Sequence, residues 1–257
     1  MMQSVELPSI PRIKGVFVTG TDTGVGKTWV TAGIAAVWRR WGLRAAYFKP
    51  IQSGCPEEGG RLIPTDARFA RDLAGLETPL DLLTPITLRL PLAPGVAAAQ
   101  EGVAVDWGRV AAALEELAAR YDFIAVEGAG GLLVPLDGCR ILVLDLIRWL
   151  RLPLLVVARA GLGTINHTAL TVMAARYSGL AVAGVILNRY PAQPGLAEKT
   201  NPEVIQEITQ VPILAQIHEV ADINLPTGRE AFLAQMDAAC RNLEQACAAR
   251  AFLECMV

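Results

Sequence analysis

The sequence predicts an α/β fold, with a single three-layer domain built on a mostly parallel sheet that has helices on both faces. Short apolar segments alternate with helix-period segments along the chain. The short segments are apolar on both sides, as strands covered from two faces must be. The 257 residues are 53% hydrophobic and 19% charged, enough for one large core. We place the domain at residues 14–257, after an N-terminal extension at residues 1–13 that we expect to be loose.

The elements follow from local signals. The expected strands, in chain order, lie at residues 16–19, 44–49, 123–126, 153–158, 182–187 and 211–217. The expected helices lie at residues 27–41, 65–73, 106–121, 141–150, a stretch ending near 177, 203–208 and about 228–252. Gly42 and Gly75 stop the first two helices, and Asp106 is a good N-cap for the third. Residues 78–104 hold four prolines and no clear period, which indicates loops and irregular pieces.

The first strand leads into the stretch around which the chain is organised. Residues 15–28 read Gly-Val-Phe-Val-Thr-Gly-Thr-Asp-Thr-Gly-Val-Gly-Lys-Thr. A strand, a glycine loop and Lys27-Thr28 at a helix start predict a phosphate-binding P-loop, although Gly20 lies one residue earlier than the usual spacing puts it. The glycines let backbone N–H groups face phosphate oxygens. Lys27 can reach the β- and γ-phosphates, and the Thr28 hydroxyl can hold Mg²⁺. The alternative is a plain glycine turn.

Polar residues also follow other predicted strands, where ligands gather in a parallel sheet. Lys49 can stabilise charge that develops in phosphoryl transfer, or it is a surface lysine. Glu127 can share Mg²⁺ with Thr28, or it is a solvated carboxylate. Asp66 is either a further metal ligand or a helix cap. Residues 161–167 either bind a carboxylate or form a simple turn. We expect His167 and His218 to be structural.

Composition narrows the classes of function. The net charge of −2 disfavours nucleic acid as a partner. Five cysteines and two histidines show no zinc-binding pattern, and the odd cysteine count fits a reducing cytoplasm. The longest apolar region, residues 141–158, is interrupted by charges and a proline, so we expect no membrane span. We therefore expect a cytoplasmic protein.

Seven motifs in order carry a resemblance to one family. They are Gly-Thr-Asp-Thr-Gly-Val-Gly-Lys-Thr (20–28), Lys-Pro-Ile-Gln-Ser-Gly (49–54), Thr-Asp-Ala (65–67), Ala-Gln-Glu-Gly (99–102), Val-Glu-Gly-Ala-Gly-Gly (126–131), Gly-Leu-Gly-Thr-Ile-Asn-His (161–167) and Gly-Val-Ile-Leu-Asn (184–188). Over about residues 15–225 the chain resembles the dethiobiotin synthetases, P-loop NTPase-like enzymes that share the longer P-loop spacing.

The resemblance implies an ATP- and Mg²⁺-dependent ring closure in biotin biosynthesis. One amine of 7,8-diaminononanoate takes up CO₂ as a carbamate, and ATP phosphorylates the carbamate oxygen. The second amine attacks the mixed anhydride, which gives dethiobiotin, ADP and phosphate. The resemblance also implies a homodimer with its active sites at the subunit interface.

The resemblance assigns roles residue by residue. Lys27 and Lys49 would be catalytic, and Thr28, Asp66 and Glu127 would hold Mg²⁺. The substrate would contact Thr23, Ser53 and, from the partner subunit, Gly163, Thr164 and Asn166. The implied ATP-binding set is Gly24, Val25, Gly26, Lys27, Thr28, Trp29, Asp66, Glu127, Gly128, Ala129, Gly130, Asn188, Ile217, His218 and Glu219.

Three positions depart from the family pattern. Arg189 stands where an acidic residue can occur, Gly95 where a bulkier residue, often His, can sit, and His218 where proline is common. Two other P-loop classes compete with the synthetase. A glutamine-dependent amide-forming enzyme needs a catalytic cysteine domain for which the chain is too short. A partitioning ATPase usually carries a second P-loop lysine, which Gly24 and Val25 do not provide.

Overall fold

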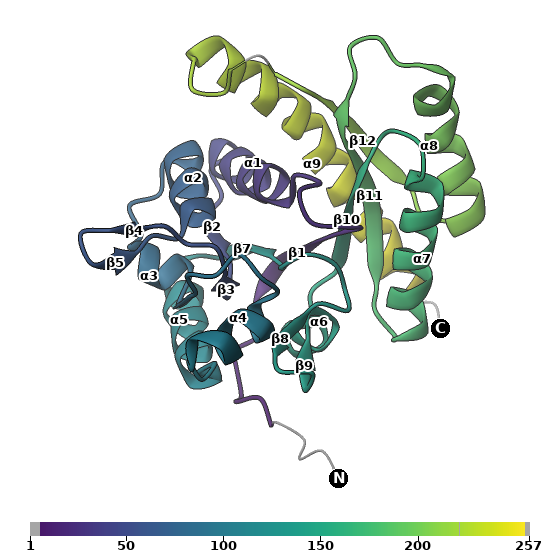
Figure 1. Cartoon of the computed structure of the whole chain (residues 1–257). Helices are drawn as coiled ribbons and strands as arrows, with labels where there is room; N and C mark the ends of the chain where they lie inside the picture. The colour runs from purple at the N-terminus through teal and green to yellow at the C-terminus, as the bar shows by residue number, and fades with distance from the viewer. Residues whose placement is uncertain (1–5, 221, 255–257) are drawn as a thin grey trace.

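The computed structural model describes residues 6–220 and 222–254, and its centre is a six-stranded parallel sheet (Figure 1). The strand order is β12-β11-β10-β1-β7-β2. These strands are β1 (Lys14–Gly20), β2 (Ala45–Phe48), β7 (Phe123–Glu127), β10 (Leu154–Arg159), β11 (Val182–Tyr190) and β12 (Ile213–His218). All of its pairings are parallel, so the predicted fold class is confirmed.

Helices cover both faces of this sheet (Figure 1). The helices α1 (Lys27–Arg40), α2 (Thr65–Ala74) and α9 (Pro226–Glu254) pack together over one face, and α5 (Trp107–Arg120) and α7 (Thr164–Tyr177) pack on the other. α8 (Leu196–Thr209) packs on α7. The remaining helices are α3 (Leu80–Leu83), α4 (Pro94–Glu101) and α6 (Val143–Leu150). One face of α5 is apolar, and its Val110, Leu114 and Leu117 side chains are fully buried.

Further short strands form three two-stranded sheets that are separate from the central sheet. They pair as β3 (Ile51–Gln52) with β6 (Ile86–Thr87), β4 (Glu57–Glu58) with β5 (Arg61–Leu62), and β8 (Pro135–Asp137) with β9 (Ile141–Leu142). None of the helices in the described part of the chain is long and apolar enough to cross a bilayer.

The register around β1 positions the candidate site. Phe17 on β1 is opposite Leu154 of β10 and Val126 of β7, and all three side chains are fully buried. Because neighbouring parallel strands end at the same edge, the loop after β1 emerges between the ends of β7 and β10. The two residues at those ends are Glu127 and Arg159.

Three expectations about the elements need correction. α4 lies inside the proline-rich region expected to be irregular, because Pro94 occupies the first helical turn, where its missing N–H costs nothing. α8 begins seven residues before residue 203 and contains Pro202. Part of the helix expected at 141–150 is the strand β9.

The N-terminal segment also differs from its expectation. The indole N–H of Trp149 donates a 2.7 Å hydrogen bond to the carbonyl of Pro8, and Leu7 and Ile10 pack against the core. The expectation of a loose extension is therefore wrong for residues 6–13, while residues 1–5 lie outside the described part of the chain.

Candidate functional site

The loop between β1 and α1 has the backbone that a P-loop requires. Gly24 and Gly26 have φ of 75° and 98°, values that favour glycine. A Cβ on Gly26 would lie 1.9 Å from the amide nitrogen of Asn188. That amide donates a 2.9 Å hydrogen bond to the carbonyl of Val25, which ties the loop to the end of β11. Glycine at position 26 therefore allows β11 to approach the loop closely.

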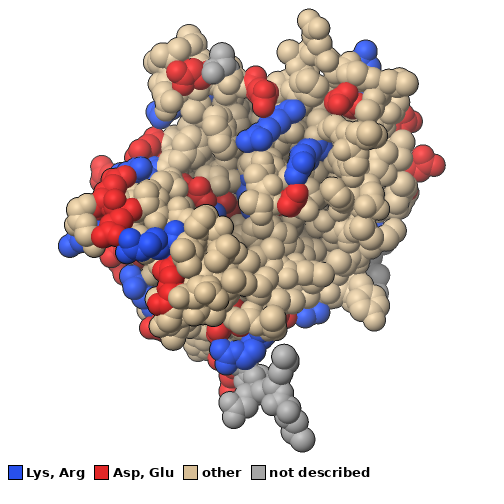
Figure 2. Space-filling model, viewed as in Figure 1, with Lys and Arg blue, Asp and Glu red and all other residues tan. Residues whose placement is uncertain are grey.

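A cavity of about 680 Å³ opens beside this loop. In the space-filling view, which has the orientation of Figure 1, a hollow has acidic and basic atoms at its floor (Figure 2). Twelve of the expected site residues line the cavity: Thr23, Gly24, Gly26, Lys27, Thr28, Trp29, Lys49, Ser53, Asp66, Glu127, Ala129 and Gly130. The fold thus brings together residues from four separate sequence motifs.

Glu127 is the polar centre of the cavity and is almost fully buried. Its Oε1 accepts hydrogen bonds from the Thr28 hydroxyl at 2.8 Å and from the Lys49 ammonium at 2.9 Å. Its Oε2 accepts a 2.6 Å hydrogen bond from the hydroxyl of Tyr47. Burial and the neighbouring Glu127 charge both raise the pKa of Tyr47, so the hydroxyl keeps its proton and donates.

Lys49 lies between two carboxylates. Its ammonium contacts Asp66 as well as Glu127. Burial lowers the pKa of Lys49, but Glu127 and Asp66 outweigh burial and hold the pKa above its usual value. The Gln52 side chain donates to the Thr65 hydroxyl at 2.9 Å and accepts from the Asp66 backbone N–H at 3.2 Å, so it orients the start of α2. Because two carboxylates contact its ammonium and raise its pKa, Lys49 is a fixed, charged group.

Lys27 behaves differently from Lys49. Its ammonium donates to the backbone carbonyl of Asp22 at 3.0 Å. Burial lowers the pKa of Lys27 to about 8, with Glu127 opposing that change and Lys49 adding to it. The two lysines thus share one electrostatic environment, but only Lys49 has a carboxylate partner among the described residues.

The oxygens of Thr28, Asp66 and Glu127 suit a magnesium ion. They are hard ligands, and Mg²⁺ at nucleotide sites commonly takes one or two carboxylates, a P-loop hydroxyl and phosphate oxygens. Thr28 bonds Glu127 directly, and the Lys49 ammonium touches both carboxylates, so the three donors converge on a small region. The donor set fits Mg²⁺.

A second cavity of about 320 Å³ lies against the end of β12. It is lined by Trp29, Asn188, Arg189, Ile217, His218, Glu219, Val220 and Phe232. The Trp29 ring packs edge-on to Phe232, with centroids 5.6 Å apart. Apolar walls with a few polar groups suit a nucleobase. Four residues of the expected ATP-binding set, Asn188 and residues 217–219, are therefore brought together beside the P-loop.

Some expected residues lie elsewhere. Val25 and Gly128 do not line the main cavity, and a Cβ on Gly128 would meet the ring of Phe17. Residues 163–166 begin α7, outside both cavities. Gly163 and Asn166 are exposed. The Thr164 side chain is buried, with its hydroxyl 3.3 Å from that of Thr168.

The sequence motifs missed several contributors. Tyr47 has no signal in a buried strand, because its neighbours are equally apolar. Gln52 lies inside the motif at 49–54, but its contribution is a hydrogen bond that its side-chain oxygen accepts from the backbone N–H of Asp66. Arg159 is the last residue of β10 and forms a 2.6 Å ion pair with Asp22 of the P-loop. Only the fold shows that Arg159 and Asp22, 137 positions apart, meet.

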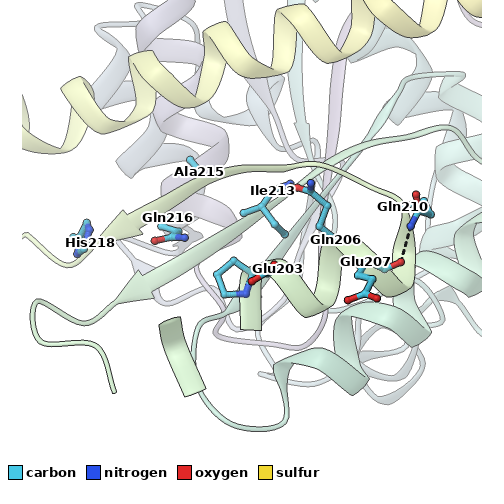
Figure 3. Close-up of a pocket in the computed structure, with 9 residues that line it drawn as sticks. Glu203, Gln206, Glu207, Gln210, Ile213, Ala215, Gln216 and His218 are labelled. Atoms are coloured by element: carbon cyan, nitrogen blue, oxygen red, sulfur yellow. Dashed lines mark hydrogen bonds between the residues drawn. The ribbon is translucent and has the colours of Figure 1, made fainter. Parts of the chain in front are cut away.

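Another cavity, of about 720 Å³, lies between α8 and β12. Figure 3 shows its side chains, among them Glu203, Gln206 and Gln216, spread along these two elements. It contains no P-loop residue and none of the Lys49, Asp66 and Glu127 cluster. We therefore do not assign nucleotide chemistry to it.

Comparison with known proteins gives the same assignment as the motifs. A family model described as an AAA domain matches residues 14–227. The ATP-dependent dethiobiotin synthetase BioD of Thermodesulfovibrio yellowstonii is 43% identical over 217 residues, covering 82% of this chain and 90% of that protein. The BioD of Anaeromyxobacter sp. (strain K) is 48% identical over 198 residues, covering 77% of this chain and 86% of that protein.

Solved structures support the fold. The MinD cell division protein of Aquifex aeolicus has a TM-score of 0.53 at 16% identity, covering 90% of this chain and 97% of that one. The cell division ATPase MinD of Pyrococcus furiosus has a TM-score of 0.51 at 19% identity, covering 91% and 99%. At such identities the likeness concerns the fold alone. By its sequence matches, the chain belongs to the ATP-dependent dethiobiotin synthetase family.

Proposed function

We propose that residues 14–257 act as one domain that binds Mg-ATP in the P-loop cavity and converts 7,8-diaminononanoate, CO₂ and ATP to dethiobiotin, ADP and phosphate. The observation that carries this proposal is the position of Lys27 and Lys49 on one cavity, together with the carboxylate of Glu127. Because the reaction consumes ATP and serves biotin biosynthesis, we place it in the cytoplasm.

We assign the nucleotide to the two adjoining cavities. The triphosphate would occupy the P-loop, where backbone N–H groups and the start of α1 favour anions. The base would occupy the smaller cavity between Trp29 and residues 217–219. Mg²⁺, held by Thr28, Asp66 and Glu127, would supply charge neutralisation at the β- and γ-phosphates.

The lysines suit the anionic intermediates of this reaction. An amine nitrogen bonds to CO₂ and releases a proton, giving a carbamate. The carbamate oxygen then displaces ADP from the γ-phosphorus, and the second amine displaces phosphate from the carbonyl carbon with loss of a further proton. Carbamate and triphosphate repel each other, so ammonium groups at 27 and 49 would lower the barrier to their approach. Thr23 and Ser53 line the cavity and would orient the diamine.

We further propose that the site is completed by a second copy of the chain. The exposed side of α7 and the loop before it is apolar, with Leu162 96%, Leu170 58%, Met173 53% and Tyr177 97% exposed. Such a row marks an interaction surface. Gly163 and Asn166 lie beside it, so a partner docked on this surface could receive both. The proposal is that they bind the substrate carboxylate of the partner's site.

The test is a product assay. With ATP, Mg²⁺, 7,8-diaminononanoate and bicarbonate, we expect dethiobiotin by mass spectrometry and one ADP for each product. Omitting diamine or bicarbonate should stop ADP formation. Equal ATP hydrolysis without diamine would exclude this proposal and favour a switch ATPase of the partitioning type.

A further inference from the structure

Arg189 lies where the two cavities meet. It lines the P-loop cavity and also the smaller cavity at the end of β12, and among the lining residues only Trp29 does the same. It directly follows Asn188, whose amide is bonded to the P-loop. A ligand that fills both cavities must pass this side chain.

The backbone aims Arg189 out of the sheet. In the pairing of β11 with β12, Asn188 is opposite Ile217 and Tyr190 is opposite His218, with a register shift between them. Arg189 is thus the extra residue of a β-bulge, and bulges near active sites redirect side chains. Its φ of 54° is unfavourable for a non-glycine residue. Such backbone strain is concentrated at ligand sites.

The charge of Arg189 is not neutralised by the protein. No ion pair or hydrogen bond of its side chain occurs within residues 6–220 and 222–254. Arg159, at the end of the neighbouring strand, is by contrast paired with Asp22. Glu219 is the acidic residue that shares the smaller cavity with Arg189. An unpaired guanidinium in this position is available to an anionic ligand.

We propose that Arg189 is a nucleotide-binding residue whose guanidinium contacts the phosphate chain where it leaves the ribose. This inference rests on the proposed nucleotide site. With the base in the smaller cavity and the β- and γ-phosphates on the P-loop, the ribose and α-phosphate must occupy the junction. Arginine suits phosphate oxygens because its planar fork can donate two parallel hydrogen bonds. The acidic residue that can occur at this position in the family would instead repel them.

The test uses two substitutions and three ligands. Arg189→Gly removes the guanidinium and relieves the positive φ, so its melting temperature should be unchanged or higher. Arg189→Lys keeps a charge but not the fork. Isothermal titration with Mg-ATP, Mg-ADP and adenosine then separates phosphate contacts from base contacts. Arg109→Ala removes an exposed arginine on α5 and is the matched control.

We expect Arg189→Gly to weaken ATP and ADP binding about tenfold or more, as for loss of a charged hydrogen bond. Adenosine binding should stay within about twofold, and Arg189→Lys should recover part of the loss. Unchanged ATP affinity in a folded Arg189→Gly variant, or an equal loss for adenosine, would overturn the inference.

The outcome can be separated from that of the product assay. If the unaltered chain makes dethiobiotin and Arg189→Gly binds ATP normally, only the role of Arg189 is wrong. If the unaltered chain makes no dethiobiotin, but Arg189→Gly still binds ATP more weakly than the unaltered chain does, the nucleotide contact holds and the proposed reaction is wrong.

Discussion

The ammonium nitrogen of Lys49 lies 2.9 Å from Oε1 of Glu127, and both side chains are buried. The same carboxylate oxygen accepts the Thr28 hydroxyl of the P-loop. One oxygen atom therefore links the helix that would hold phosphate to the lysine that would meet the carbamate. A change at the Lys49 end of this link should affect chemistry more than nucleotide binding.

Replacing Lys49 tests this division. Lys49→Ala should lower dethiobiotin formation by about 10³-fold or more, because a preorganised charge at the reacting oxygens is lost. Mg-ATP affinity should change by less than about fivefold, since Lys27 and the loop N–H groups remain. Rapid-quench product assays and ATP titration measure the two quantities.

The variant also leaves Glu127 and Asp66 without their ammonium partner, which should cost about 3–5 kcal/mol of stability. Activity is therefore compared at a temperature where circular dichroism shows the variant folded. Normal turnover there would remove Lys49 from the mechanism.

Tyr47 is a positioning residue for Glu127, and its hydroxyl can be removed without changing the ring. Tyr47→Phe leaves Oε2 of a buried carboxylate without its hydrogen bond, so we expect a loss of about 1–3 kcal/mol in the free energy of unfolding. The Mg²⁺ concentration for half-maximal activity should also rise, by about three- to tenfold, because outer partners orient metal ligands. Tyr121→Phe, which loses a contact with the Thr78 hydroxyl remote from the cavity, is the control. A stability loss with no shift in the Mg²⁺ midpoint would limit Tyr47 to a structural role.

Sequence reasoning succeeded where a residue's role depends on its neighbours in the chain. The P-loop could be predicted because strand, glycines and Lys27 are consecutive, and each strand-end residue could be placed because parallel strands end together. Lys49 and Glu127 were expected near one cavity on this basis, and the structure places them in contact.

Contacts between distant segments could not be predicted in the same way. Arg159 gives no local sign that it will pair with Asp22, and Tyr47 resembles any strand residue until β2 is laid beside β7. α4 was missed for another reason, because prolines that usually break helices can also begin them. Gly95 in α4 approaches the backbone of Gly138, where a Cβ would lie 2.9 Å from the nitrogen, so this departure from the family pattern suits close packing.

The apolar row on α7 predicts self-association. Leu170→Glu puts a charge in its middle, and we expect the dimer to dissociate at micromolar concentration in light-scattering measurements. If Gly163 and Asn166 complete the partner's site, turnover should fall with dissociation while ATP binding persists. Val103→Glu places the same charge on a 44% exposed valine outside α7 and should remain dimeric. An unaltered chain that is monomeric and fully active would contradict a shared site.

The lowered pKa of Lys27 predicts proton uptake when ATP binds. With its pKa at about 8, Lys27 is charged below pH 8 and loses its proton as the pH rises through that value. A triphosphate favours the charged form and raises the pKa, so binding at pH 8 should take up about half a proton, and at pH 9 close to one. ATP affinity should accordingly fall as the pH rises above 8. Titration calorimetry in buffers of different ionisation enthalpy measures the uptake directly. Lys27→Arg stays protonated throughout this range, so its side chain should take up no proton. Any proton exchange that this variant shows belongs to ATP itself and is subtracted from the uptake of the unaltered chain. Equal uptake by Lys27→Arg and the unaltered chain would show that Lys27 is already charged before the nucleotide arrives.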